Sequence, residues 1–347
     1  MSAALVAEPT SAPTETLPSL HDYVESSGFS SLLVGPSKDP NAKITILLVS
    51  AESGRAALAV KAPTTSKAAD AVEAERRVLC DLLRELPPEA AESLPRVVGR
   101  VEFDGRPALV TTALRGTPMS TLYLRWRHTA GPARVAEDFA ALEAWLIRFQ
   151  AATERGVSPI DMDGGVMLRL RERFAAADGL EAQLERLGDI HARLQCSATP
   201  RTAVHGDLWF GNLLMAEGRI SGVVDWEAAA VCGEPVRDLV RFANMYALYL
   251  DRRTRVGRRV AGHGGLRARD WGAGLEYALT GAGWFPELFR RFLQRGLSRL
   301  GAPAERWRDA ALAGIAEVAA FTDEDEFARC HFALFQRLVE RKDHAND

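Results

Sequence analysis

Side chains suited to phosphoryl transfer gather in one stretch of the chain, AVHGDLWFGNLLMAEGRISGVVDWE. Phosphoryl transfer requires a carboxylate that can accept a proton from the attacking hydroxyl, hard oxygen ligands for Mg²⁺, and a cation on the phosphates. Asp207 can supply the first, and Asn212 and Asp225 can supply the oxygen ligands. The stretch therefore contains residue types that this chemistry needs.

The spacing of these residues predicts that they meet in space. Asp207 follows a short apolar strand, and Asn212 comes five residues later on the same loop. Two apolar runs then flank a turn at Glu217 and Gly218, as in a β-hairpin. A hairpin of this size returns Asp225 to the neighbourhood of Asn212, so we expect it to deliver the base and both metal ligands to one place.

The order of these residues resembles the protein-kinase catalytic loop, H-R-D-L-x-x-x-N followed by a metal-binding Asp. With Gly206 in place of Arg, and D-W-E in place of D-F-G, the stretch is more similar to the aminoglycoside phosphotransferase and choline kinase family. The pattern of that family is H-G-D-x-x-x-x-N, then a strand and I/V-D-W/F-E. The resemblance covers residues 32–250 and implies that Asp207 is the catalytic base and that Asn212 and Asp225 bind Mg²⁺.

Three residues near this motif have alternative interpretations. We expect His205 to brace the loop or to be a hydrogen-bonded packing residue, rather than to take part in the chemistry. Glu227 is either a supporting group behind the metal ligands or an N-cap of the following segment. Asp238 matches an Asp that anchors the catalytic loop in the family; the alternative is an acid favoured at a helix N-terminus by the macrodipole.

The upstream part of the chain offers the lysine and glutamate that a kinase-like fold requires. Lys61 ends the apolar run 57–60, which resembles V-A-I-K, although lysines commonly end strands. The next helix carries Glu73 and Glu75, which differ by about 200° in direction, so only one can face Lys61. Glu75, with Leu79 four residues on, better matches the family pattern E-x-x-x-L, and the resemblance implies a Lys61–Glu75 pair at the nucleotide.

The run 108–118 resembles the hinge of the family, an apolar strand that leads into a short segment ending near Gly116. The resemblance implies that the backbone of Thr112, Ala113 and Leu114 meets the adenine of ATP. An edge strand that ends in a turn is the plain alternative, and it does not contradict the hinge.

The phosphate loop departs from that of protein kinases. No G-x-G-x-x-G occurs, and the segment 35–42 that stands in its place has one glycine and two prolines. The family often lacks a glycine-rich loop here. We expect Ser37 and Lys38 to approach the phosphates.

A small-molecule hydroxyl is the expected acceptor. Only about a dozen residues separate Asp225 from Asp238. A protein kinase has a longer activation segment at this place, and that segment ends in A-P-E. This sequence has neither the longer segment nor the A-P-E motif. Candidate walls of the acceptor pocket are Trp209, Trp226, Trp271, Trp284 and the acidic run 323–326. The alternatives are tryptophans in the core and a capping box at 322–325. Amino sugars, other sugars, amino alcohols and nucleoside-like metabolites all stay open as acceptors.

Hydrophobic periodicity predicts an α+β chain, and the resemblance to the family implies that it forms a two-lobed, protein-kinase-like fold. We expect a disordered tail over 1–19, a nucleotide-binding lobe of five antiparallel strands and one helix over 20–114, and a mainly helical lobe over 115–347. Expected strands are 31–34, 44–49, 56–61, 96–103 and 107–112. Expected helices are 21–27, 66–86, 137–153, 168–194, 236–250, 284–300, 303–320 and 323–341, with a loop over 257–274.

Composition limits the kind of partner. The 347 residues carry a formal net charge of −3, with 47% apolar and 26% charged residues, so a dedicated nucleic-acid or membrane-surface protein is not expected. Neither a secretory signal nor a long apolar run occurs, so we expect a cytoplasmic protein; oligomeric state stays open. The four cysteines form no C-x-x-C pair, which argues against a disulfide framework or zinc site.

The function that these features predict is an ATP- and Mg²⁺-dependent phosphotransferase that moves the γ-phosphoryl group to a small-molecule hydroxyl. A nucleotide-binding pseudokinase with a regulatory or scaffold role is the main alternative, and the atypical phosphate loop is its support. A protein kinase is a third possibility. Transfer of phosphate to a protein, but to none of a panel of metabolites, would favour it.

Overall fold

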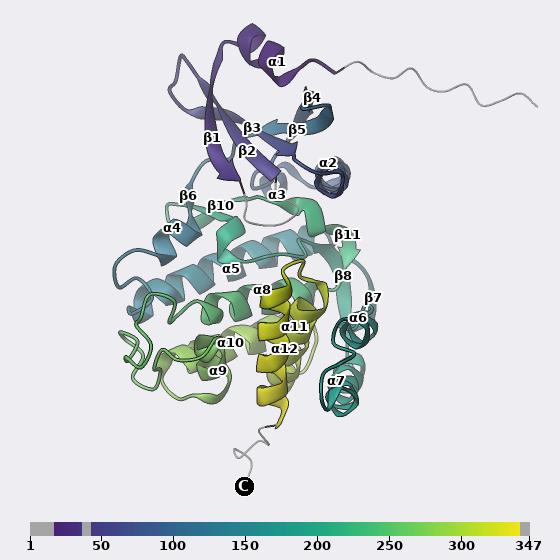
Figure 1. Ribbon diagram of the computed structural model, residues 1–347, viewed down its shortest axis with the longest axis vertical. Coiled ribbons are helices and arrows are strands. Elements are labelled where there is room, and N and C mark those ends of the chain that lie inside the picture. Colours follow the sequence, from purple (N-terminus) through teal and green to yellow (C-terminus); the bar gives the residue numbers. More distant parts are fainter. Residues whose placement is uncertain (1–16, 37–42, 341–347) are drawn as a thin grey trace, which may run out of the picture.

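The chain forms a small sheet-containing part above a larger helical part (Figure 1). The computed structural model describes residues 17–36 and 43–340. A five-stranded antiparallel sheet forms most of the first part, and helices dominate the second. The predicted α+β architecture is confirmed.

The five strands of the sheet are those that the sequence predicts, and they lie in the order β1-β2-β3-β5-β4. Their bounds are Phe29–Pro36 (β1), Lys43–Ser50 (β2), Ala56–Pro63 (β3), Val97–Phe103 (β4) and Arg106–Thr112 (β5). Val60 and Ala62 are buried in a small core that α1 (Leu20–Ser27) helps to cover. Because successive side chains of a strand point to opposite faces, Lys61 is directed away from this core.

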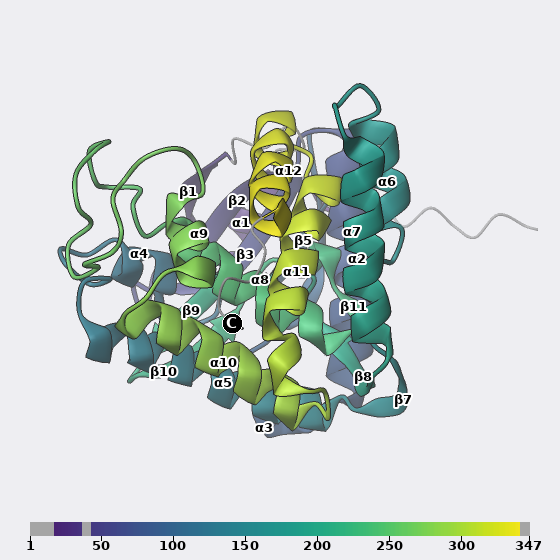
Figure 2. The same ribbon diagram turned by 90° about the horizontal axis from the view of Figure 1, so that it is seen from below.

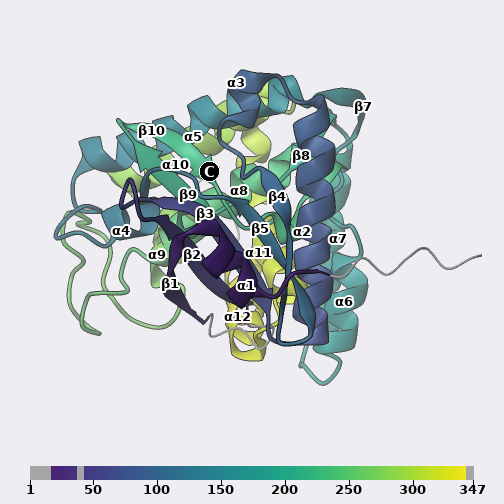
Figure 3. The same ribbon diagram turned by 90° about the horizontal axis from the view of Figure 1, so that it is seen from above.

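Helix α2 (Ser66–Glu85) packs against β3 and β5, at the edge of the sheet when seen from above (Figure 3). It begins after Thr65, whose side chain accepts a hydrogen bond from the N–H of Ala68. Its buried face includes Val72, Glu75 and Leu79, which follow helical spacing. The short helix α3 (Pro88–Ala91) follows at the predicted stop, where Pro87 and Pro88 cannot continue α2.

The helical part is built around α8 (Pro235–Leu248), twelve of whose fourteen residues are buried. The other helices are α4 (Met119–Tyr123), α5 (Pro132–Ala152), α6 (Val166–Arg173), α7 (Leu180–Gln195), α9 (Ala273–Thr280), α10 (Trp284–Arg299), α11 (Trp307–Phe321) and α12 (Asp325–Glu340). From below, α8 lies behind α10 and α11 (Figure 2). It packs against α9, α10 and α11, and its Phe242 ring lies 5.2 Å from that of Phe139 in α5. Helix α8 is therefore surrounded by other helices and held in place by their packing.

Two small three-stranded sheets contain the strands that flank Asp207, Asn212 and Asp225. One has the order β10-β9-β6 and contains the predicted hairpin; the other has the order β11-β8-β7. The bounds are Thr117–Pro118 (β6), Arg155–Pro159 (β7), Ala198–Val204 (β8), Leu213–Ala216 (β9), Arg219–Val223 (β10) and Ala230–Gly233 (β11). Glu217 and Gly218 both have positive φ, as a two-residue hairpin turn requires. Because β11 pairs with β8, the chain after Asp225 returns beside the strand that leads to Asp207.

Several predicted helix boundaries are wrong. The expected helix 168–194 is two helices, because Gly179 adopts a left-handed conformation at the start of α7. Helix α5 begins at Pro132, a favoured first helical position, rather than at residue 137. Thr322 ends α11 and does not open a capping box, and α12 starts at Asp325. Strand β7, helix α4 and helix α9 were not predicted, because each is short and is stabilised by tertiary packing.

The last residues of the predicted N-terminal tail, Pro18 and Ser19, already contact the sheet and the first helix. Residues 1–16 lie outside the described residues. Ser19 caps α1, and the carbonyl of Pro18 accepts a hydrogen bond from the N–H of Glu102 in β4 (2.8 Å). No helix in the described part of the chain is long and apolar enough to span a membrane.

Candidate active site

The loop that carries Asp207, which is the predicted catalytic loop, starts where β8 ends, and Asp238 of α8 holds its backbone. The Asp238 carboxylate accepts hydrogen bonds from the N–H of His205 (2.7 Å) and of Gly206 (2.9 Å). Asp238 is buried, and burial raises the pKa of its carboxyl although His205 and the two N–H donors act against this effect. Asp238 therefore lies in the first turn of α8 and also binds the backbone of the loop, as the resemblance implied.

Asp207 presents its side chain from this loop with contacts at both carboxylate oxygens. Oδ1 accepts from Nε (3.0 Å) and Nη2 (2.5 Å) of Arg241. The amide nitrogen of Asn212 donates to the backbone carbonyl of Asp207 (2.9 Å) and contacts its Oδ2 (3.3 Å). The Asp207 side chain is 32% exposed, so it is held firmly and still reaches open space.

Asp225 lies at the end of the hairpin and meets the lysine of β3. Lys61 Nζ is 2.8 Å from Asp225 Oδ1 and 2.7 Å from both carboxylate oxygens of Glu75. Glu75, not Glu73, faces Lys61, and its Oε1 also accepts from the N–H of Trp226 (3.2 Å). The structure therefore brings together residues from β3, α2 and the hairpin, separated by up to 164 positions.

The charges in this cluster stabilise one another. The Lys61 ammonium holds the pKa of the Asp225 carboxyl well below its ordinary value, against the effect of burial. Burial alone would lower the pKa of Lys61, but the charges of Asp225 and Glu75 outweigh it and raise that pKa above its ordinary value. Lys61 is thus protonated and Asp225 ionised across the range in which enzymes work.

His205 and Glu227 lie behind these residues. His205 is fully buried; its Nε2 lies 2.9 Å from the carbonyl oxygen of Val224, and its Nδ1 accepts from the N–H of Asp207 (3.3 Å). It joins the two loops that carry Asp207 and Asp225. Glu227 forms an ion pair with Lys43 and lies within the 3₁₀ turn η2 (Trp226–Ala228), so it is not an N-cap.

The predicted hinge leaves one N–H group for a ligand. The N–H of Thr112 donates to the carbonyl of Arg96 and that of Ala113 to the carbonyl of Ala57, both at 2.9 Å. Among these three hinge residues, Leu114 is the one whose N–H has no hydrogen bond within residues 17–36 and 43–340. The predicted phosphate contacts Ser37 and Lys38 lie outside the described residues.

Sequence reasoning missed two cations of the site, Arg241 and Lys43. Arg241 is three residues after Asp238 in PVRDLVR, so both lie on one face of α8 and point to one loop; this spacing was a usable signal. Lys43 begins β2 and contacts Asp225 Oδ1 at 3.4 Å. Nothing in its local sequence distinguishes it from other lysines at strand ends.

A cavity of about 610 Å³ opens beside Asp207, and we call it the acceptor chamber. Its lining includes Trp209, Trp271, Asp323 and Glu324 from the predicted walls, as well as Tyr249. A smaller cavity of about 290 Å³ shares Asp207 and Asp323 with the acceptor chamber. The predicted acidic and aromatic wall is therefore present in part.

Four predicted wall residues do not line the acceptor chamber. Trp226 is fully buried, with its indole N–H on the carbonyl of Val223 (2.8 Å), so it belongs to the core. Trp284 donates to the carbonyl of Gly262 (2.8 Å) and does not line the acceptor chamber. Asp325 forms an ion pair with Arg173 (2.6 Å), and neither Asp325 nor Glu326 lines the chamber. For both tryptophans the alternative of a packing role therefore holds, since Trp226 lies in the main core and Trp284 packs against it.

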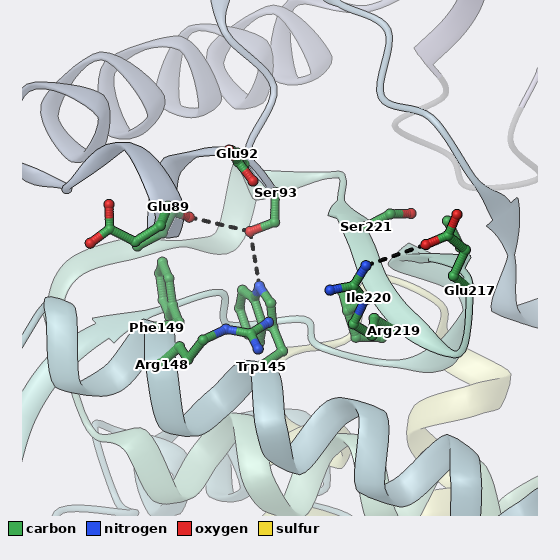
Figure 4. Close-up of a pocket in the computed structure, with 12 residues that line it drawn as sticks. Glu89, Glu92, Ser93, Trp145, Arg148, Phe149, Glu217, Arg219, Ile220 and Ser221 are labelled. Atoms are coloured by element: carbon green, nitrogen blue, oxygen red, sulfur yellow. Dashed lines mark hydrogen bonds and ion pairs between the residues drawn. The ribbon is translucent and has the colours of Figure 1, made fainter.

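Another cavity, of about 410 Å³, lies behind the catalytic hairpin (Figure 4). It is bounded by Trp145 and Arg148 of α5, by Ser93 after α3, and by residues of β10 such as Ser221. The indole N–H of Trp145 donates to Ser93 Oγ (2.9 Å). None of the predicted catalytic, metal or nucleotide residues that the structure describes lines this cavity.

Comparison with known sequences identifies the family. The model of the phosphotransferase enzyme family, APH, matches residues 45–277. The chain belongs to this family. The predicted resemblance and the prediction of a small-molecule kinase are confirmed, whereas no curated protein sequence gives a significant match.

Solved structures of other phosphotransferases have the same fold. The apoenzyme of the macrolide 2′-phosphotransferase MphH from Brachybacterium faecium is 17% identical, with a TM-score of 0.52 over 90% of this chain and 96% of that one. A thermostable mutant of the aminoglycoside phosphotransferase APH(4)-Ia with ADP and hygromycin B is 13% identical, with a TM-score of 0.53 over 92% and 98%. Another such mutant, with AMP-PNP and hygromycin B, is 14% identical and has a TM-score of 0.54 over 90% and 94%. At these identities the likeness shows the fold, which confirms the kinase-like architecture of this phosphotransferase.

Proposed function

We propose that this phosphotransferase uses ATP and Mg²⁺ to phosphorylate a hydroxyl group of a small, amino-bearing molecule. The observation that carries the proposal is the meeting of Asp207, Asn212 and Asp225 beside the Lys61–Glu75 ion pair. Each residue type has a defined task in phosphoryl transfer. Of these five residues, Asp207 is the one that also lines the acceptor chamber.

The side chains present fit a magnesium ion. The amide nitrogen of Asn212 is held by Asp207, which leaves its amide oxygen as the ligand atom. Both lysine contacts of Asp225 fall on Oδ1, which leaves Oδ2. One amide and one carboxylate oxygen are ligands that Mg²⁺ takes together with phosphate oxygens and water. In this proposal the bound ion neutralises the charge of the triphosphate.

The nucleotide would lie under the sheet. Lys61, held by Glu75, is placed to contact the phosphates, and Leu114 has an N–H to offer the adenine. Two of the structurally similar proteins were solved with ADP or AMP-PNP, which supports ATP as the donor. An ATP donor favours a cytoplasmic location.

The transfer step follows from the position of Asp207. The acceptor hydroxyl gives its proton to the Asp207 carboxylate as its oxygen forms a bond to the γ-phosphorus. The bond between the γ-phosphorus and the bridging β,γ oxygen breaks, and ADP leaves with that electron pair. His205 and Asp238 keep the loop in place during this exchange.

The charge of the acceptor chamber favours an amino-bearing acceptor. Its lining acids are Asp207, Asp251, Asp270, Asp323 and Glu324, and its lining arginines are Arg241, Arg252 and Arg269. Some of these charges are already paired: Arg241 with Asp207, Arg269 with Glu276 (2.8 Å) and Asp323 with Lys67 (2.8 Å). Aromatic faces beside an acidic excess suit a protonated amino sugar or amino alcohol.

The test is ADP release with a panel of aminoglycosides, choline, homoserine and sugars, for the wild type and for Asp207→Asn. We expect acceptor-dependent, Mg²⁺-dependent turnover that falls about 10²- to 10⁴-fold in Asp207→Asn, the range ascribed to a general base. Equal turnover in both proteins would exclude this kinase mechanism. ATP binding without transfer to any acceptor would support the pseudokinase.

A further inference from the structure

Arg241 makes the strongest contact to the proposed base. Two of its guanidinium nitrogens, Nε and Nη2, converge on Oδ1 of Asp207 at 3.0 and 2.5 Å. The Arg241 side chain is 23% exposed, so little water competes for the contact. A charge-assisted contact of this kind restrains an acid more firmly than a neutral hydrogen bond does.

The position of Arg241 on the buried helix α8 makes the restraint rigid. It lies on α8 three residues after Asp238, one turn along the same helix face. Asp238 fixes the backbone of His205 and Gly206, while Arg241 fixes the side chain of Asp207. One buried helix therefore sets both the path of the loop and the orientation of its carboxylate.

The neighbouring arginine of α8 has a different partner. Arg237 pairs with Glu317 of α11 at 2.6 Å, and its side chain is 22% exposed, as Arg241's is 23%. Burial raises the pKa of the Glu317 carboxyl, and Arg237 acts against this effect. The two arginines thus share helix, exposure and charge, and both line the smaller cavity beside Asp207, but of the two it is Arg241 that hydrogen bonds to the Asp207 carboxylate. This pair supplies a matched control.

We propose that Arg241 is a positioning residue, which holds Oδ1 of Asp207 and so presents Oδ2 to the acceptor hydroxyl. This inference rests on the proposed function, in which Asp207 is the base. With Oδ1 occupied by two donors, Oδ2 is the oxygen open to a further donor; its other neighbour is the Asn212 amide at 3.3 Å. Arg241 acts through Asp207 rather than on the phosphates.

The experiment compares Arg241→Gln, Arg241→Lys and Arg237→Gln with the wild type, using the best acceptor of the panel. We expect kcat to fall about ten- to a hundred-fold in Arg241→Gln, since small misplacements of a reacting group have effects of this size. KM for ATP is expected within twofold of wild type, and Arg241→Lys recovers part of kcat. Arg237→Gln lowers the melting temperature but keeps kcat within twofold.

A double-mutant cycle with Asp207→Asn shows whether Arg241 acts through the base. If it does, Arg241→Gln costs little more once Asp207 has been changed, so the two effects are not additive. Fully additive losses, an unchanged kcat in Arg241→Gln, or a change confined to KM for the acceptor would each overturn the inference. An Asp207→Asn protein as active as wild type would instead refute the proposed function itself, so the two failures are distinguishable.

Discussion

Gly206 lies so close to the carbonyl group of Ala228 that a Cβ atom at position 206 would stand 2.2 Å from that oxygen. The backbone of Gly206 also has a φ of +79°, which side chains with a Cβ rarely adopt. Both constraints arise because η2 folds back onto the catalytic loop. The glycine before Asp207 therefore follows from the packing of two loops, and an arginine at this position, as in protein kinases, would need a different path.

Replacing Gly206 with alanine is expected to displace the catalytic loop. The left-handed conformation alone costs about 1–2 kcal/mol for a residue with a Cβ, and the contact with Ala228 adds to this cost. We expect a lower melting temperature and at least a roughly hundred-fold loss of kcat, since Asp207 is the next residue. Thermal unfolding and ADP release measure the two effects.

The matched control is Gly218→Ala at the hairpin turn. Gly218 has a similar φ of +73°, but an added Cβ would meet nothing within 4 Å. We expect it to lose stability through strain alone and to keep most of its activity. Equal losses of kcat in the two variants would show that strain, and not the Ala228 contact, limits position 206.

Glu75→Gln tests the ion pair that spans the sheet and α2. The amide keeps the shape of the side chain but removes the charge that holds Lys61, whose Nζ lies 2.7 Å from both Glu75 oxygens. Hydrogen bonds to charged groups contribute about 1.5–3 kcal/mol, so kcat/KM for ATP is expected to fall roughly ten- to a hundred-fold. Glu73→Gln is the control, because Glu73 pairs with Arg76 at the surface of the same helix. A similar loss in both variants would contradict a specific role of Glu75.

The catalytic hairpin could be predicted because its information is local. Asp207, Asn212 and Asp225 occur within nineteen positions, and the turn between them contains a glycine at the position that needs positive φ. The strand of Lys61 and the helix of Glu75 were predicted from their periodicity for the same reason.

The parts that escaped prediction depend on packing between distant segments. Whether a tryptophan lines a cavity depends on which helices cover it, so Trp226 and Trp271 looked alike in the sequence but one is in the core and the other in the acceptor chamber. The partner of Arg241 lies 34 positions away on another element. Lys43 reaches Asp225 across 182 positions, a contact that no local pattern encodes.

Trp271→Ala tests the acceptor chamber. Trp271 lines the chamber and packs edge-on against Phe327, with ring centroids 5.6 Å apart. Loss of an aromatic wall is expected to raise KM for the acceptor about ten-fold, equal to about 1.4 kcal/mol, with KM for ATP unchanged. Trp126→Ala, at an 86% exposed position, should leave both constants unchanged. A rise in KM for ATP alone would place the acceptor elsewhere.

The buried histidine of α12 predicts how stability depends on pH. Burial lowers the pKa of His331 from 6.5 to about 3, and its Nδ1 lies 2.9 Å from the carbonyl oxygen of Phe327, to which it donates. Between these values the unfolded chain binds a proton that the folded chain does not, so the free energy of unfolding falls as pH falls below 6.5. From pH 7.5 to 5.5 this residue is expected to account for about 1.4 kcal/mol.

Urea unfolding at pH 7.5 and 5.5 measures this effect, with His331→Asn as the variant that can still donate to Phe327 but does not titrate. Its loss of stability between the two pH values should be smaller than that of the wild type by about 1.4 kcal/mol. Some loss should remain, because burial also lowers the pKa of His191 and of His263. An identical dependence in His331→Asn and wild type would mean that His331 takes up its proton without unfolding of the α12 core.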